Sequence, residues 1–220
     1  MLIALLLGIP LGLWAGVAPR SVAARTITAG SILGFSLPTF WVGLMLIMVF
    51  SVWLGWLPAS GRGPTTELAG IPVSFLSLEG LRHLALPAAN LALFNLSLVA
   101  RLVRSGAREA MQQDYVRFAR AKGLAESRIV GVHVLRNVLV PVATVAGVEF
   151  GSVIAFAVVT ESIFAWPGMG KLLIDSIGVL DRPVIVAYLC IVVVLFVTIN
   201  LAVDLLVSWL DPRVRLEAGP

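Results

Sequence analysis

The chain has 220 residues, of which 59% are hydrophobic and only 13% are charged. Soluble domains carry about 45–50% apolar and about 25% charged residues, so the composition excludes an ordinary soluble protein and indicates a membrane protein. The formal net charge of +4 does not indicate a nucleic-acid partner, because the basic residues are distributed between long apolar segments.

Five apolar segments are candidates for membrane-spanning helices, which need about 20 residues each. In chain order they cover residues 2–17, 27–54, 84–102, 138–164 and 184–210. Their apolar character is continuous rather than alternating, which favours helices over a membrane β-barrel. The sequence therefore predicts an all-α, polytopic transmembrane helix bundle with about five spanning helices, in a single domain over residues 1–220.

Small residues and prolines occur within these apolar segments. Gly8 and Gly12 form a Gly-x-x-x-Gly pair, and Gly147 is a further small residue, so we expect close helix contacts at these positions. Pro38 and Pro87 are expected to bend or start helices.

Arginine and lysine set the expected orientation, because loops rich in these residues stay in the cytoplasm. Most of them lie in the first connection, in residues 103–137 and in the C-terminal tail. The opposite side carries Arg62, Arg82, Lys171 and Arg182. The sequence thus predicts that residues 103–137 and the C-terminus are cytoplasmic and that the loops 55–82 and 165–183 are external.

The start of the chain is unusual for this topology. Met1 is followed at once by apolar residues without a basic flank, and segment 2–17 is barely long enough to span a membrane. We therefore expect a further segment upstream, such as another spanning helix.

The polar stretch Glu109–Asn137 is long enough for two short helices, and Gly123 is suited to ending the first of them. The apolar residues of the first helix fall at i, i+4, i+7 and i+8, which predicts a single stripe. They are Met111, Tyr115, Phe118 and Ala119. Such a stripe can lie on the lipid surface or dock into a partner protein, and a simple basic loop is the plainer alternative.

Five separated stretches, in the same order along the chain, resemble one family of transport proteins. Outside the loop they are Ser36–Trp41, Leu57–Gly61, Glu161–Gly170 and Asp211–Arg215. In the loop, Ala119, Gly123 and Leu135 match the Glu-Ala-Ala…Gly…Ile-x-Leu-Pro signature of permease subunits in binding-protein-dependent ATP-binding-cassette (ABC) importers. The runs Tyr115–Arg117, Ala119–Leu124 and His133–Pro141 resemble the dipeptide, oligopeptide and nickel branch, whose members usually have six spanning helices.

The resemblance implies a multi-pass inner-membrane permease that translocates peptides or a related small solute. The implied partners are a homologous second permease, two cytoplasmic ABC ATPase subunits, an extracytoplasmic substrate-binding protein and the lipid bilayer. ATP and Mg would be bound by the ATPase subunits, and no cofactor by this chain. The implied coupling contacts with the ATPase are Tyr115, Phe118, Ala119, Lys122, Gly123 and Leu124.

Polar residues within the apolar segments are candidates for the translocation path. They are Asn90, Asn95 and Glu149. A charge at the bilayer centre costs about 2.5–3.5 kcal/mol, so Glu149 is expected to face the bundle interior or a water path. The alternative for the asparagines is a hydrogen bond between helices, worth about 0.6 kcal/mol on average.

The resemblance also assigns a role to the loop 165–183 and the helix end before it. The path would close there and the binding protein would dock, with Glu161, Trp166 and Gly168 as the candidate residues.

Catalysis and metal binding have little support in the sequence. The run before Lys171 lacks the first glycine of a phosphate-binding loop, and Leu172 stands where Ser or Thr is required. No hydrolase motif joins Ser60 to a histidine, and two histidines with one cysteine argue against a metal site. An ion-gradient-driven secondary transporter remains the alternative function, although no internal repeat is evident.

Overall fold

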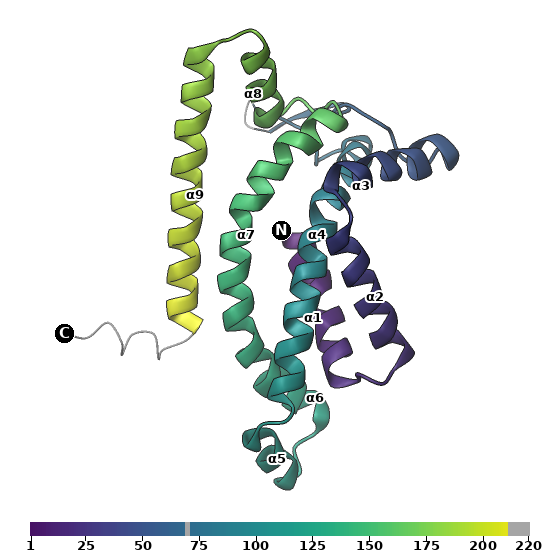
Figure 1. Cartoon of the computed structure of the whole chain (residues 1–220), viewed down its shortest axis with the longest axis vertical. Helices are drawn as coiled ribbons and strands as arrows, with labels where there is room; N and C mark the ends of the chain where they lie inside the picture. The colour runs from purple at the N-terminus through teal and green to yellow at the C-terminus, as the bar shows by residue number, and fades with distance from the viewer. Residues whose placement is uncertain (69–70, 211–220) are drawn as a thin grey trace, which may run out of the picture. The chain divides into compact units, whose positions relative to one another are not determined.

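The computed structural model describes residues 1–68 and 71–210 and is built mainly from helices (Figure 1). The first elements are α1 (Leu2–Val17), α2 (Val22–Ser36), α3 (Thr39–Leu46), the π-helical turn η1 (Ile47–Trp53), β1 (Thr66–Leu68) and β2 (Ile71–Val73). They are followed by α4 (Leu78–Ala110), α5 (Asp114–Ala121), α6 (Glu126–Arg128), the π-helical turn η2 (Ile129–Val134), α7 (Leu135–Ile163), α8 (Met169–Gly178) and α9 (Arg182–Leu210). The predicted all-α class is confirmed.

Within the described residues, three helices are long and apolar enough to cross a membrane: Leu78–Ala110, Glu126–Ile163 and Arg182–Leu205. The pair Val22–Ser36 and Thr39–Trp53 makes a fourth if it counts as one span, and α1 is a shorter apolar helix. These elements correspond in order to the five predicted segments. The predicted C-terminal motif Asp211–Arg215 lies outside the described residues.

The second predicted segment is interrupted at its proline. α2 ends at Ser36, and Pro38 is extended (φ −60°, ψ 134°) before α3 begins at Thr39. Proline has no N–H to donate and keeps the residue before it out of the α region, so one helix stops and another starts here. By contrast, Pro87 lies inside the continuous helix α4.

The chain divides into two compact units, which are described separately. Unit 1 comprises Met1–Ser36, Asn95–Phe150 and the chain from Phe196, and unit 2 comprises Leu37–Phe94 and Gly151–Leu195. The helices α4, α7 and α9 each contribute residues to both units. That residues 1–220 act as one transmembrane domain stays a prediction.

In unit 1, α1 packs against α4 through a strip of small residues. A Cβ atom on Gly8 would lie 2.9 Å from a Val99 methyl, and one on Gly12 would lie 2.6 Å from the carbonyl oxygen of Ala100. The two helices therefore approach almost backbone to backbone, as the Gly-x-x-x-Gly pair predicted. Gly147 allows a similar approach, because a Cβ there would lie 2.6 Å from a Val203 methyl of α9.

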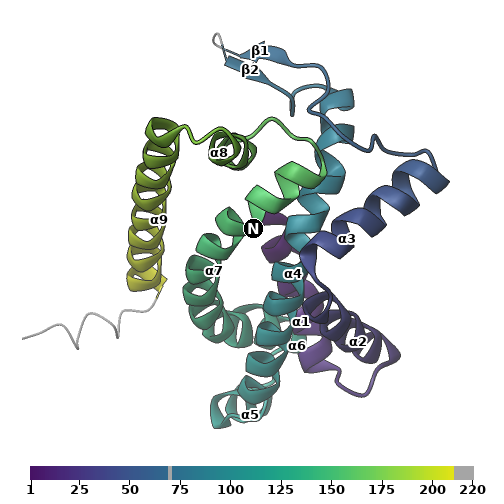
Figure 2. The same cartoon turned by 45° about the horizontal axis from the view of Figure 1, so that its top comes forward.

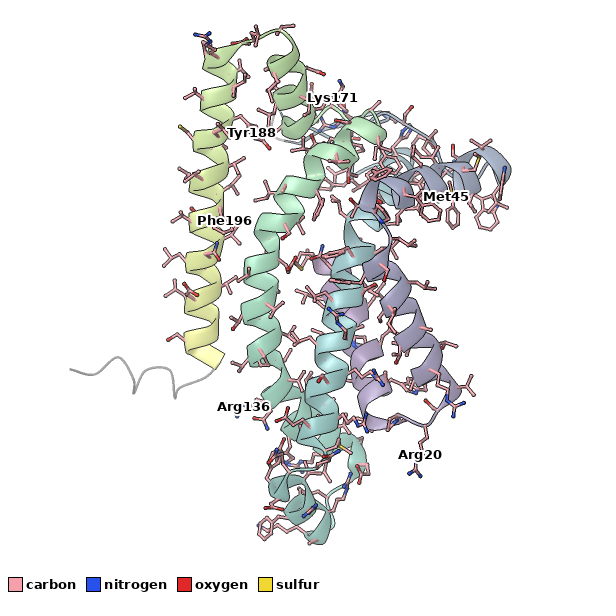
Figure 3. The ribbon with its side chains drawn as sticks, viewed as in Figure 1. Arg20, Met45, Arg136, Lys171, Tyr188 and Phe196 are labelled. Atoms are coloured by element: carbon pink, nitrogen blue, oxygen red, sulfur yellow. The ribbon has the colours of Figure 1, made fainter. Side chains whose placement is uncertain are left out.

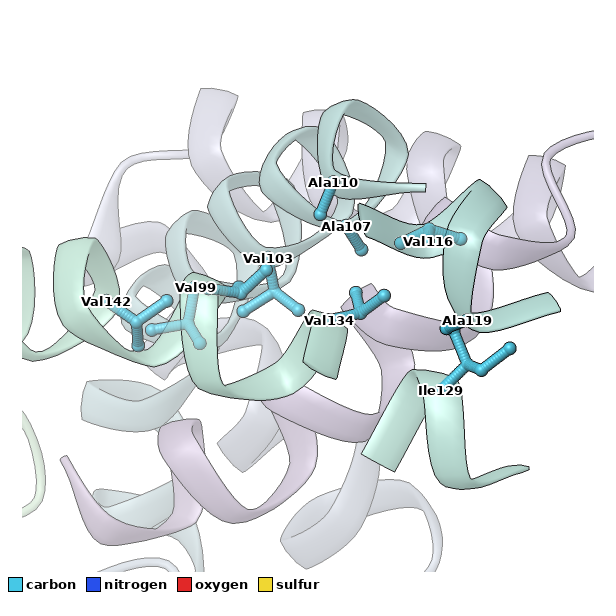
Figure 4. Packing of buried hydrophobic residues seen from close by; sticks show 10 residues of the cluster. Val99, Val103, Ala107, Ala110, Val116, Ala119, Ile129, Val134 and Val142 are labelled. Atoms are coloured by element: carbon cyan, nitrogen blue, oxygen red, sulfur yellow. The ribbon is translucent and has the colours of Figure 1, made fainter. Parts of the chain in front are cut away.

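A buried apolar cluster completes unit 1 (Figure 4). It draws residues from α4, α5, η2 and α7, and side chains of α1 pack against it. Its members are Val99, Val103, Ala107, Ala110, Val116, Ala119, Ile129, Val134, Val138 and Val142. The short helices after α4 therefore share the core of unit 1 and do not form an independent loop.

Unit 2 contains the strands and α8 (Figure 2). β1 and β2 form an antiparallel hairpin in which Thr66 pairs with Val73. The chain before the hairpin is tied to α4, because Arg82 donates a hydrogen bond to the Trp56 carbonyl (2.9 Å) and His83 Nδ1 lies 3.1 Å from the Ser60 carbonyl. The chain between η1 and the hairpin is therefore held against the start of α4 by these hydrogen bonds.

Candidate functional site

The segment between α4 and α7, residues 111–134, is called the connecting segment below. Its helix α5 turns Val116 and Ala119 into the buried cluster, with 0% and 5% of their surfaces exposed. Tyr115 is 37% and Phe118 63% exposed on the neighbouring face of the helix. The predicted apolar stripe is therefore divided, because Ala119 faces the chain's own core and the two aromatic rings face outward.

The turn after α5 is a helix C-cap of the Schellman type. Gly123 has φ +75°, the left-handed conformation that glycine adopts without steric cost. The Leu124 amide donates to the Ala119 carbonyl (3.2 Å) and the Gly123 amide donates to the Arg120 carbonyl (2.9 Å), which is the bond pattern of this motif. The prediction that Gly123 ends the first short helix is confirmed.

A forked ion pair crosses this turn. Arg120 Nε lies 2.6 Å from Glu126 Oε1, and Arg120 Nη2 lies 3.3 Å from Glu126 Oε2. The hydrogen bond to Glu126 raises the pKa of the Arg120 guanidinium above its ordinary value. Because both side chains are well exposed, the pair links α5 to α6 across the turn but adds little stability.

The outward face of α5 is held in place by two further contacts. Asn137 Nδ2, at the start of α7, donates to the Tyr115 hydroxyl at 2.8 Å. The Lys122 ammonium lies 4.5 Å from the centre of the Phe118 ring, within cation–π range. The connecting segment thus presents two aromatic rings and one cation on a support that is packed from behind.

The predicted path residues have different surroundings. Asn90, in unit 2, is 2% exposed and its Nδ2 donates to Thr160 Oγ1 at 3.0 Å, which is the hydrogen bond between helices that the alternative anticipated. Asn95, in unit 1, is 4% exposed. Glu149 Oε2 is buried and has no hydrogen-bond partner among the described residues. A role in the path stays a prediction for all three.

Glu161, Trp166 and Gly168 come together in unit 2. Glu161 Oε2 accepts the backbone N–H of Lys171 in the first turn of α8 (2.9 Å), and the Trp166 amide donates to the Glu161 carbonyl (2.8 Å). A Cβ on Gly168 would overlap the Glu161 carboxylate. Glu161 therefore caps α8 from α7, close to the position of Lys171 in Figure 3. The predicted docking role stays a prediction.

Sequence reasoning missed two residues of these sites. Val116 was named only within the run Tyr115–Arg117 and was not predicted to be buried, although it lies three residues before Ala119 and so on the same helix face. Thr160 was missed because its partner Asn90 is 70 residues away, and no local pattern links them.

The sequence matches the family described as "binding-protein-dependent transport system inner membrane component" over residues 8–216. The chain belongs to this family. The resemblance predicted from the motifs is therefore confirmed, and the chain is a multi-pass inner-membrane permease subunit of a binding-protein-dependent ABC importer. The secondary-transporter alternative finds no support in these matches.

Named relatives extend the match across the chain. A di/tripeptide transport system permease of Pseudomonas aeruginosa is 43% identical over 227 residues, which cover 98% of this chain and 68% of the relative. A dipeptide transport system permease of Escherichia coli is 38% identical over 230 residues, with the same coverages. An oligopeptide transport system permease of Bacillus subtilis is 42% identical over 214 residues, covering 97% of this chain and 66% of the relative.

The fold also matches a solved structure, that of the MetNI methionine ABC transporter in an inward-facing conformation. The TM-score is 0.71 at 18% sequence identity, and the match covers 96% of this chain and 88% of the other. At this identity the similarity establishes a shared fold.

Proposed function

We propose that this permease translocates short peptides and that ATPase subunits drive it through α5. The substrate class is supported by the names of its relatives, which are transport permeases for dipeptides, di/tripeptides and oligopeptides. The coupling role is carried by one observation: α5 buries Val116 and Ala119 in the permease core while it exposes Tyr115 and Phe118.

In this proposal the connecting segment is cytoplasmic and works as a lever. Two ATPase subunits bind ATP and Mg, and their closure pulls on the pair of permeases. Tyr115, Phe118 and Lys122 supply the outer contacts, because exposed aromatic and cationic groups are typical anchors of protein interfaces. The pull reaches the spanning helices through Ala119, since its face of α5 is packed against α4 and α7.

The turn at Gly123 and Leu124 keeps the lever stiff. Its two backbone hydrogen bonds set the direction in which the chain returns to α7, and the Arg120–Glu126 pair spans the same turn. A flexible linker would absorb the displacement, whereas a rigid capped helix transmits it. Gly123 and Leu124 thus act by shape rather than by direct contact with the ATPase.

The path for the peptide would run past the polar groups of the spanning helices. Glu149 offers an unpaired carboxylate oxygen that suits the ammonium group of a peptide, and Asn90 and Asn95 offer amides. On the outer side, the Glu161 cap would hold α8, with Trp166 and Gly168, where a substrate-binding protein delivers its ligand. A homologous second permease would complete the channel.

Uptake by the assembled transporter tests this proposal. The permease, its partner permease, ATPases and binding protein are reconstituted in proteoliposomes, and entry of a labelled dipeptide is measured. Uptake should require ATP and should survive an ionophore that collapses ion gradients. Uptake that persists without ATP and stops with the ionophore would overturn the proposal.

A matched pair of variants locates the coupling site. Phe118→Ala should lower uptake about tenfold, the effect expected when an interface anchor is truncated. Phe75→Ala removes another exposed ring, 54% exposed in unit 2, and should leave uptake unchanged. Equal uptake by the two variants would remove α5 from the coupling mechanism.

A further inference from the structure

Four arginines gather where α4 leads into the connecting segment. Arg101, Arg104 and Arg108 follow one another at spacings of three and four residues, so they lie along one side of α4. Arg20 joins them from the turn between α1 and α2, and Figure 3 shows it at the same end of unit 1 as Arg136. Together with Gln112 these residues form what is called the basic cleft.

The basic cleft contains two adjoining cavities. The first, about 490 Å³, is lined by Arg101 and Ser105, and the second, about 420 Å³, is lined by Arg20 and Val17. Arg104, Arg108 and Gln112 line both cavities. The cleft therefore offers two compartments with a shared wall of hydrogen-bond donors.

The charge of the cleft is not balanced by the described part of the chain. Three arginines elsewhere in the described residues are paired with carboxylates: Arg82 with Glu79, Arg117 with Asp114 and Arg120 with Glu126. None of the four cleft arginines has such an ion pair within the described residues, and Glu109 is the one carboxylate lining the two cavities.

Arg104 gives the clearest sign of a missing partner. Its Nε atom is buried and has no hydrogen-bond partner among the described residues. Like charges one helical turn apart repel, and a buried donor without an acceptor is costly. An anion in the cleft would remove both penalties.

The depth of the cleft indicates which anion. Arg101 directly follows the apolar stretch 84–100 of α4, so it lies where the hydrocarbon part of the span ends. At 1.5 Å per residue, Arg104 lies about 5 Å and Arg108 about 10 Å farther along the helix. The polar head-group layer of one leaflet is about 5–8 Å thick, so Arg101 and Arg104 lie at the level of the lipid phosphates and Arg108 lies just beyond it.

We propose that the basic cleft binds the head group of an anionic phospholipid with two linked phosphodiesters, one in each cavity. Arginine forks donate paired hydrogen bonds to phosphate oxygens, and basic pockets between spanning helices suit such head groups. Diphosphatidylglycerol has this chemistry, and a lipid with a single phosphodiester would fill one cavity. The bound lipid would join the end of α1 to α4 beside the connecting segment.

Lipid retention by the purified, assembled transporter tests the proposal. The complex is exchanged into nanodiscs of phosphatidylethanolamine with diphosphatidylglycerol, with phosphatidylglycerol, or with neither, and lipid carried through gel filtration into detergent is quantified by native mass spectrometry. The complex should retain diphosphatidylglycerol in preference to phosphatidylglycerol. A parallel arm with inorganic phosphate distinguishes lipid from the free anion.

Two matched variants assign the binding to the cleft. Arg104→Gln should retain about tenfold less diphosphatidylglycerol, the loss expected when a charge-assisted contact is removed. Arg25→Gln makes the same charge change on an exposed residue of α2 that lines neither cavity, and it should behave like the unmodified chain. If Arg104→Gln does not assemble, the exposed Arg108→Gln gives the same comparison.

Three outcomes would overturn the proposal. One is equal lipid retention by Arg104→Gln and Arg25→Gln. Another is displacement of the lipid by millimolar inorganic phosphate, which would make the cleft a site for a free anion. The third is an ATPase subunit that protects the cleft from arginine-directed labelling when no lipid is present, because the occupant would then be a protein.

Discussion

Gly123 fixes the turn of the connecting segment through its backbone conformation. A Cβ at this position would meet nothing within 4 Å, so the cost of Gly123→Ala comes from φ +75° alone, roughly 1–2 kcal/mol. Uptake should fall with alanine, fall further with valine and be largely kept with asparagine, which tolerates this conformation. Membrane insertion should be intact in all three, as measured by membrane fractionation beside the uptake assay.

Gly131 provides the control for this series. It also has open space around its Cβ position, but it lies in η2 without a positive φ. Gly131→Ala should therefore leave uptake unchanged. Full activity of Gly123→Val would show that the turn does not need the left-handed conformation.

Single residues differ in how far the sequence specifies their surroundings. Gly123 could be predicted, because glycine after a basic amphipathic helix is a local signal. The sequence could not predict that Val116 is buried and Phe118 exposed. Apolar residues fall on two overlapping faces of α5, and only the packing partners decide which face is buried. Glu161 as a cap of α8 depends on a turn of the main chain that residue spacing does not encode.

At the scale of elements, the close contact of α1 with α4 predicts how glycine substitutions change the stability of the fold. Gly12→Ala places a methyl group 2.6 Å from the Ala100 carbonyl oxygen, which forces the helices apart and should destabilise the fold by about 1–3 kcal/mol. Gly30→Ala in α2 meets nothing within 4 Å and should be neutral or slightly stabilising, since alanine is the better helix former.

Thermal unfolding of the two alanine variants in detergent measures this difference. The midpoint for Gly12→Ala should lie below that of the unmodified chain, while Gly30→Ala should match or exceed it. Equal midpoints would mean that α1 and α4 can separate without loss of packing.

The bounds of an element could be predicted where its residues are continuously apolar. The predicted bounds were wrong where an apolar helix continues as an amphipathic one. α1 has the predicted bounds, because its apolar run is continuous from Leu2. α4 continues to Ala110, beyond the predicted end at 102, because arginines on one side are offset by Val103, Ala107 and Ala110 on the other. The length of an apolar run identifies a membrane-spanning segment. How far the helix continues beyond that run as an amphipathic helix depends on tertiary packing.

For the whole molecule, the orientation of the chain in the membrane is predicted only from the distribution of its arginines and lysines. It is tested by labelling thiols from each side of the membrane. The native Cys190 is exposed and is first replaced by serine. Phe118→Cys and Val179→Cys then place thiols on residues that are 63% and 77% exposed, one in the connecting segment and one after α8. A membrane-impermeant maleimide should label Phe118→Cys in inside-out vesicles and Val179→Cys in spheroplasts, because arginine-rich loops stay in the cytoplasm.

The same thiols also test the assembly. Adding ATPase subunits to inside-out vesicles should protect Phe118→Cys, because an aromatic anchor is covered when its partner docks. Val116→Cys is the control for accessibility, since Val116 is fully buried and its thiol should react slowly with or without ATPase. If Phe118→Cys and Val179→Cys react from the same side, or if the ATPase leaves Phe118→Cys reactive, then α5 is not the element through which the motor acts on this permease.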